Sequence, residues 1–118
     1  MEIKYMGLSS NKVELIGRML DDTKFMPYGD GECCTFRLRT TPRILNSNGQ
    51  YVNEVNDVPI TVLNSNQVEV IKKYGVPGKQ LMLTCYYKTW EANGVKQHAV
   101  VTLNIQLGDT PLQPKDSN

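Results

Sequence analysis

Hydrophobic and polar residues alternate along five stretches of this chain, with the two-residue period of a β-strand that buries one face. In the first stretch, Val13, Leu15 and Met19 alternate with Glu14 and Arg18. The same period recurs four more times. It predicts strands at residues 13–19, 34–41, 58–62, 81–88 and 98–105.

The second stretch has two chemically different faces. Cys34, Phe36 and Leu38 fall on the side that should be buried, and Arg37 and Arg39 fall on the opposite side. A basic outward face is what a phosphate-contacting surface requires. On the same alternation, the buried face of the fifth stretch consists of Ala99, Val101, Leu103 and Ile105.

Turn signals separate these stretches. Asn48 and Gly49 lie in the polar segment 42–51, which predicts a long mobile hairpin loop. The pair Asn93-Gly94 predicts a tight turn between the last two strands.

One helix is expected between the third and fourth strands. Ser65 or Asn66 would cap its start, Val68 and Ile71 share one face, and Gly75 ends it. The order of three strands, a helix and two strands is that of an oligonucleotide-binding barrel. The sequence therefore predicts an all-β OB-fold: a five-stranded Greek-key barrel with one short helix between strands 3 and 4.

Length and composition favour a single domain. With 118 residues, of which 40% are hydrophobic, the chain is long enough for one small core. We expect a domain over residues 1–109 and a short flexible tail over 110–118, which has two prolines and no apolar pattern. Because no apolar run has the length of a signal peptide or membrane span, a cytoplasmic location is expected, in a bacterium or a phage-infected host cell.

The cysteines and the single histidine carry little functional signal. Cys33, Cys34 and Cys85 are an odd number of thiols, and adjacent strand residues point to opposite faces, which argues against a disulfide framework. A zinc site formed by these thiols and His98 is an alternative, but no Cys-x-x-C spacing supports it. Without a nucleophile motif, paired carboxylates or a glycine-rich phosphate loop, we expect no enzyme, no metal and no cofactor.

The stretch from Asn11 to Thr40 has a specific order of motifs. It reads Asn-x-Val-x-Leu-Ile-Gly-Arg, then an acidic residue, an aromatic-Met-Pro-x-Gly turn, and a strand that ends apolar-x-Leu-x-Thr. The positions are Asn11, Val13, Leu15, Ile16, Gly17, Arg18, Asp22, Phe25, Met26, Pro27, Gly29, Phe36, Leu38 and Thr40. This order and spacing resemble the opening of the bacterial and phage-type single-stranded DNA-binding protein (SSB) family, and a looser similarity continues to Gly108.

This resemblance implies a barrel that coats single-stranded DNA with little sequence preference and assembles as a homo-oligomer, a tetramer or a dimer. The chain departs from the family in two respects. Where members place tryptophans, near the loop after the second strand and at the start of the third, it has Arg43 or Ile44 and Asp57 or Val58. The acidic C-terminal tip that recruits replication and repair partners is also absent from the sequence.

Single-strand binding combines a basic groove with aromatic faces on which bases stack. The candidates for stacking are Trp90, Tyr86, Tyr28 and Tyr51, although Trp90 could instead make an oligomer contact and Tyr86 could pack on the barrel exterior. The candidates for phosphate contact are Arg18, Arg37, Arg39, Arg43, Lys72, Lys73 and Lys88.

Three functions therefore compete. The leading hypothesis is a protein that protects single-stranded DNA in replication, recombination and repair. The first alternative is a primosomal or other replication-accessory barrel that acts mainly by contacting replication proteins. A third is an interaction-only barrel without nucleic acid, because a fold does not fix a function.

Overall fold

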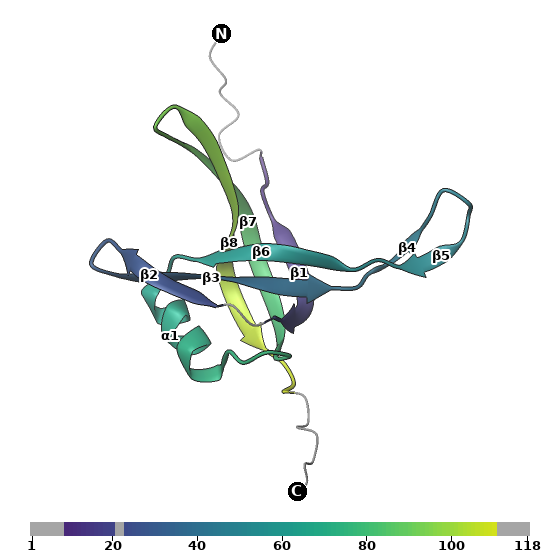
Figure 1. Cartoon of the computed structure of the whole chain (residues 1–118), viewed down its shortest axis with the longest axis horizontal. Coiled ribbons are helices and arrows are strands. Elements are labelled where there is room, and N and C mark those ends of the chain that lie inside the picture. Colours follow the sequence, from purple (N-terminus) through teal and green to yellow (C-terminus); the bar gives the residue numbers. More distant parts are fainter. Residues whose placement is uncertain (1–8, 21–22, 111–118) are drawn as a thin grey trace, which may run out of the picture.

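The computed structural model describes residues 9–20 and 23–110. Figure 1 shows crossed strands from which three hairpins project, with one helix beneath them. The elements are β1 (Val13–Met19), β2 (Lys24–Tyr28), β3 (Gly31–Thr40), β4 (Arg43–Leu45), β5 (Tyr51–Asn53), β6 (Asn56–Val62), α1 (Ser65–Tyr74), β7 (Gln80–Ala92) and β8 (Val95–Leu107).

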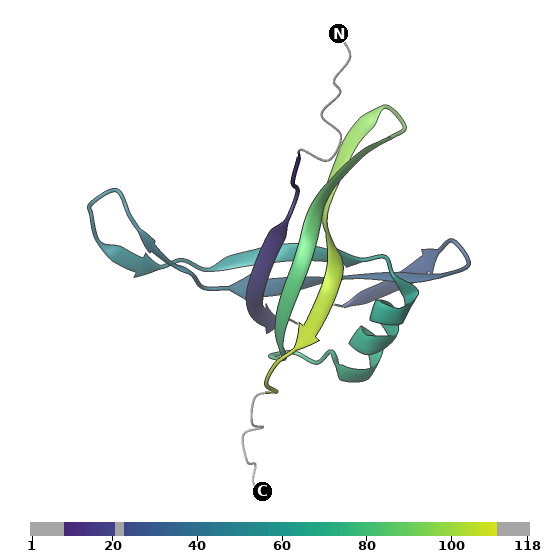
Figure 2. The same ribbon diagram turned by 180° about the vertical axis from the view of Figure 1, so that it is seen from behind.

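Five of the strands close into a barrel. The sheet runs β1, β7, β8, β6, β3, and an additional pairing of β1 with β3 joins its two ends. Figure 2 shows β1, β7 and β8 side by side on the far side of the barrel. All neighbours are antiparallel except β6 and β8, which are parallel. The predicted five-stranded barrel, with its helix between the third and fourth barrel strands, is confirmed.

Gly17 allows the barrel to close. At this end of β1, the pairing changes from β7 to β3, with Arg18 opposite Arg39 and Met19 opposite Leu38. A Cβ on Gly17 would lie 2.3 Å from the Arg39 carbonyl oxygen. Only a residue without a side chain therefore permits the close backbone approach.

The helix covers one end of the barrel core. Its N-cap is Asn64, whose side chain accepts hydrogen bonds from the backbone N–H groups of Asn66 and Gln67, so the predicted cap at Ser65 or Asn66 was wrong by one or two residues. The helix packs on the barrel through its own buried residues, Val68 and Ile71. The core cluster consists of Met19, Cys34, Phe36, Leu38, Ile60, Val62, Val68, Ile71, Leu81, Leu83 and Cys85.

Three hairpins extend beyond the barrel, and two of them differ from the prediction. The segment interpreted as an aromatic-Met-Pro-x-Gly turn is strand β2, which pairs with an earlier start of β3, and the chain turns only at Gly29 and Asp30. The segment interpreted as a long mobile hairpin loop, 42–51, does form a hairpin, but its two sides are the paired strands β4 and β5, and β5 continues to Asn53. The third hairpin, β7–β8, turns at Asn93 and Gly94 as predicted.

The predicted burial of the last strand was only partly correct. The β7–β8 ladder has an irregularity at Thr84 and Cys85, where Cys85 pairs with Thr102 but Thr84 pairs with Asn104. The extra residue, Leu103, is exposed, and Thr102 is buried. A bulge of this kind shifts the alternation by one residue.

The core side of β8 is therefore formed by Val100 and Thr102 before the bulge and by Ile105 and Leu107 after it. Val101 is 3% exposed and is therefore buried as predicted, although it lies outside the core cluster. Ala99 is only half-buried, and Leu103, which was predicted to be buried, is exposed.

The predicted C-terminal tail can be compared with the structure only in part. Most of the predicted tail, residues 111–118, lies outside the described residues, as do the residues at the position of the acidic tip. The described helix is neither long nor apolar enough to cross a membrane.

Candidate nucleic-acid interface

A groove lies between the β2–β3 hairpin and the β7–β8 hairpin. We call it the hairpin groove. Its volume is about 520 Å³. Each of five strands contributes to its lining: Met26 and Tyr28 of β2, Cys33 and Thr35 of β3, Thr61 of β6, Lys88 and Trp90 of β7, and Ala99 and Val101 of β8. Leu63, just after β6, completes the lining.

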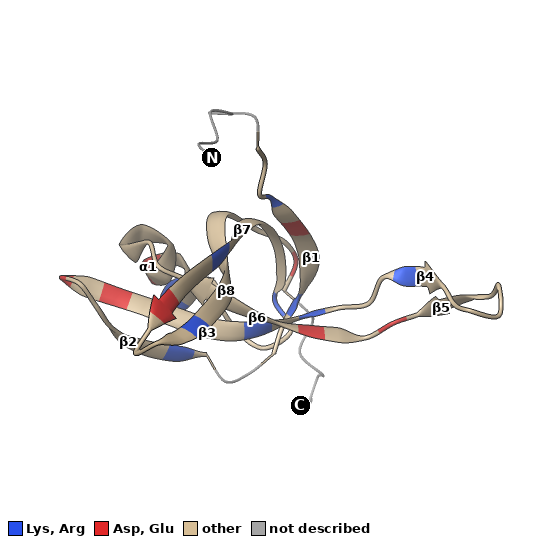
Figure 3. Cartoon of the chain, turned by 90° about the horizontal axis from the view of Figure 1, so that it is seen from above, with Lys and Arg blue, Asp and Glu red and all other residues tan. Residues whose placement is uncertain are grey.

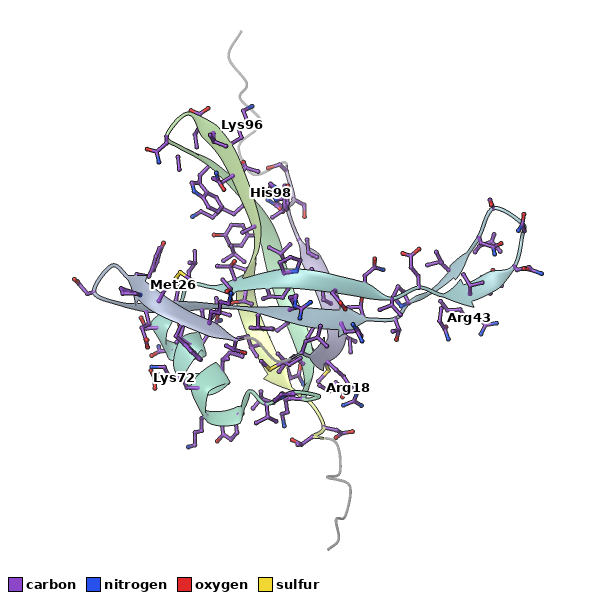
Figure 4. The ribbon with its side chains drawn as sticks, viewed as in Figure 1. Arg18, Met26, Arg43, Lys72, Lys96 and His98 are labelled. Carbon is purple, nitrogen blue, oxygen red and sulfur yellow. The ribbon has the colours of Figure 1, made fainter. Side chains whose placement is uncertain are left out.

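Strand alternation explains why these side chains meet. In each strand the lining residues lie two apart, so they share the face that points away from the barrel core. Figure 4 shows Met26 on the β2–β3 hairpin and His98 and Lys96 on the β7–β8 hairpin, which rises beside it. The bulge at Leu103 contributes, because it turns Val101 toward the groove rather than the core.

The groove has aromatic walls and an almost uncharged floor. Tyr28 and Trp90 come from opposite hairpins, and they are 48% and 43% exposed. The floor is formed by Cys33, Val101 and the hydroxyl-bearing side chain of Thr61, among others. Partly exposed rings above an apolar surface are suited to stacking flat, uncharged groups such as nucleic-acid bases.

Positively charged side chains lie in this groove and beside it. Lys88 is part of its lining. A second hollow, of about 380 Å³, shares Thr35 with the groove and is lined by Lys24, Phe36, Arg37 and Pro59. Figure 3 shows Lys and Arg positions in blue on β2, β3 and β7. Aromatic rings beside a basic edge are the two features that single-strand binding combines.

Arg39 lies one outward position beyond Arg37 on β3, and it is already paired. Its Nε and Nη2 donate to the two carboxylate oxygens of Asp57, at 2.7 and 2.9 Å. The hydrogen bond to Arg39 lowers the pKa of Asp57, and the same bond raises the pKa of Arg39. Asp57 is the second residue of β6.

Tyr86 lies next to the hairpin groove without lining it. It shares the outward face of β7 with Lys88 and Trp90, stands opposite Val101 in the ladder, and is partly buried. This position allows the packing against the barrel exterior that was the alternative for Tyr86.

Two predicted residues lie on the separate β4–β5 hairpin. The guanidinium carbon of Arg43 is 5.6 Å from the centre of the Tyr51 ring, within the range of a cation–π contact. Tyr51 is 62% exposed. Figure 1 shows this hairpin on the side of the barrel away from β2. It offers a second, isolated aromatic and basic surface.

The remaining predicted cations lie away from the hairpin groove. Lys72 is on α1, where it forms an ion pair with Glu32 and lies 5.5 Å from the centre of the Phe25 ring. Lys73 lies over Tyr74 of the same helix. Figure 4 shows Lys72 and Arg18 below the crossed strands, on the opposite side from Lys96 and His98. The Nη1 of Arg18 donates to the Gly78 carbonyl oxygen at 2.9 Å.

The structure therefore brings Tyr28, Lys88 and Trp90 together in the groove and places Arg37 in the adjoining hollow. Tyr86 and Arg39 lie next to these residues. The candidates that lie elsewhere are Arg18, Arg43, Tyr51, Lys72 and Lys73. Sequence reasoning missed Lys24, Met26 and Leu63. The alternation within β2 would have given Lys24 and Met26 the face of Tyr28, had the segment been recognised as a strand.

The thiols and the histidine do not assemble. Cys33 lies on the groove floor, whereas Cys34 and Cys85 belong to the core, where burial raises the pKa of each to about 11. His98 stacks on Tyr87, with ring centres 5.8 Å apart. Among the described residues, no three His, Cys, Asp or Glu side chains are grouped so as to hold a metal ion.

Comparison with known proteins agrees with this geometry. Residues 10–108 match the profile of the "Single-strand binding protein family". No curated protein sequence is significantly similar to the chain.

Three of the solved structures that share the fold show the extent of the similarity. A Plasmodium falciparum SSB complex with ssDNA has a TM-score of 0.69 and 21% identity, covering 92% of this chain and 100% of the other. The mitochondrial single-stranded DNA-binding protein of S. cerevisiae has a TM-score of 0.65 and 17% identity, covering 85% and 97%. The small single-stranded DNA-binding protein of Streptomyces coelicolor has a TM-score of 0.62 and 12% identity, covering 85% and 95%. Since the family profile spans nearly the whole described barrel, the chain belongs to the single-strand binding protein family.

Proposed function

We propose that this protein binds single-stranded DNA in the hairpin groove and coats exposed strands during replication, recombination and repair. The observation that carries the proposal is the placement of Tyr28 and Trp90 on opposite walls of one groove with Lys88 between the hairpins. Membership of the single-strand binding protein family supports it independently. The proposed site of action is the cytoplasm of a bacterium or of a phage-infected cell.

Binding in this groove would combine two sequence-independent contributions. Bases stack on the exposed faces of Tyr28 and Trp90, and each stack contributes about 1–3 kcal/mol. Phosphates follow the positive edge formed by Lys24, Arg37 and Lys88. The few hydroxyl groups on the floor provide little means of distinguishing one base from another, so we expect weak sequence preference.

Tryptophan fluorescence tests this proposal directly, because Trp90 is the single tryptophan of the chain. Titration with oligo-dT should quench its emission, and the apparent affinity should fall as salt is added, since phosphate contacts release counterions. Oligo-dA and oligo-dC should quench to a similar extent. If low salt produces neither quenching nor binding, the proposal is wrong and a role through protein contacts becomes the better explanation.

The outward face of β1 and β7 supports assembly into a homo-oligomer. Ile16 stands opposite Met82 across these strands and is 62% exposed. A shallow hollow beside it is lined by Leu15, Met82 and Gln106, among others. An exposed apolar strip on a regular sheet is typical of a contact between copies. Light scattering should give the mass of a dimer or tetramer, and the substitution I16D should shift it toward the monomer.

A further inference from the structure

Arg39 and Asp57 form a fork-to-fork ion pair on the outward surface of the barrel. They are directly opposite each other in the β3–β6 ladder. Two parallel N–H···O hydrogen bonds, of 2.7 and 2.9 Å, join the guanidinium to both carboxylate oxygens. The two side chains keep 48% and 28% of their surface exposed, so solvent and ligands can reach the pair.

The pair continues the row of residues that borders the proposed DNA site. Thr35, Arg37 and Arg39 occupy successive outward positions of β3, which are spaced about 7 Å apart along a strand. Thr35 lines the hairpin groove, and Arg37 lines the hollow that adjoins it. A strand that leaves the groove past Arg37 therefore meets the Arg39–Asp57 pair next.

A carboxylate occupies an arginine fork in the same way as a phosphate. Both anions offer two oxygens that accept parallel hydrogen bonds from Nε and one Nη group. Asp57 takes these two donors of Arg39. Because an exposed ion pair is weak, the pair does not lock the arginine permanently, but it makes any phosphate compete for it.

We propose that Asp57 acts as an internal competitor for DNA phosphate at Arg39, and that it thereby lowers the affinity and the salt dependence of single-strand binding. This inference rests on the proposed function of the groove. Both arginines stay charged at this edge, but Asp57 already occupies the two donors of Arg39 that a phosphate would use. The strand is then held firmly in the groove and more weakly beyond it.

The substitution Asp57→Asn tests the proposal, since it keeps the shape of the side chain and removes the competing charge. For single strands, log K changes with log salt by about 0.7 per phosphate contacted. One added contact at Arg39 should make the slope steeper by about 0.7. It should also raise affinity about fivefold at 0.1 M salt, with the difference vanishing near 1 M. Quenching of Trp90 by oligo-dT provides the measurement.

Two controls separate this effect from a general change in charge. In the double variant D57N/R39Q, the slope should return to the wild-type value. Glu32→Gln alters the net charge equally and releases Lys72, which lies on the helix away from the groove, so it should leave the slope unchanged.

The proposal is overturned if D57N leaves the slope unchanged, or if E32Q or D57N/R39Q steepens it as much as D57N does. Absence of wild-type binding would instead refute the groove as a DNA site.

Discussion

Truncation of Trp90 is the most informative single perturbation of the groove. Trp90 is 43% exposed on the groove wall, so one face of its ring is available to one base. Loss of that stack should cost about 1–3 kcal/mol. This corresponds to a roughly 5- to 140-fold increase in Kd. Because W90A also removes the fluorophore, the assay is the anisotropy of a labelled oligo-dT.

Tyr74 offers a matched control for this change. It lies on α1, away from the hairpin groove, and is 44% exposed, close to the exposure of Trp90. The substitution Y74A therefore removes a ring of similar exposure that does not line the groove. We expect Y74A to bind oligo-dT within about twofold of wild type, since removal of an uninvolved ring changes no stack. Equal losses in W90A and Y74A, or no loss in W90A, would refute the assignment of the groove.

Three further predictions address charge, barrel closure and burial. Arg37→Gln should make the salt dependence shallower by about 0.7 and weaken oligo-dT binding about fivefold at 0.1 M salt; an unchanged slope would show that no phosphate lies there. Gly17→Ala should lower the free energy of unfolding by about 1–3 kcal/mol, because its Cβ meets the Arg39 carbonyl oxygen at 2.3 Å; an unchanged urea midpoint would contradict this. Burial raises the pKa of Cys34 and Cys85 to about 11. Thiols of the unfolded chain lose their protons from about pH 8.5, so stability should fall as the pH rises from there toward 11; a urea midpoint independent of pH over this range would contradict it.

The barrel could be predicted because apolar and polar residues alternate with a two-residue period along most of its strands. Apolar residues two apart mark the core side of β1, β3 and the first half of β7, and Leu38, Leu83 and Met19 are buried as expected. The helix between β6 and β7 was equally visible from Val68 and Ile71. These are local signals, and each can be read without knowing which strand pairs with which.

What the sequence does not contain is the pairing between strands. The bulge opposite Cys85 depends on how β7 and β8 pair. The alternation of apolar and polar residues around Leu103 does not indicate it. Strand β2 is exposed along its whole length and contains Pro27, so it has no period to detect. It becomes a strand because β3 begins early enough to pair with it.

The sequence predicted the type of site, a basic and aromatic surface, better than the individual residues that form it. Residue type pointed to Trp90, Tyr28 and Lys88, which the groove brings together. The same reasoning selected Lys72, whose partner Glu32 lies 40 residues away in the sequence. It also selected Arg39 without its partner Asp57. Ion pairs of this separation depend on the tertiary structure, which composition and alternation do not reveal.

The location of the DNA is the central claim, and NMR mapping tests it most directly. Oligo-dT added to isotope-labelled protein should shift the methyl signals of Thr35, Thr61, Ala99 and Val101, which line the hairpin groove. The signals of the buried methyl groups of Val68, on α1, should not shift. Shifts concentrated on α1 or on the β4–β5 hairpin, with the groove signals unmoved, would contradict the account.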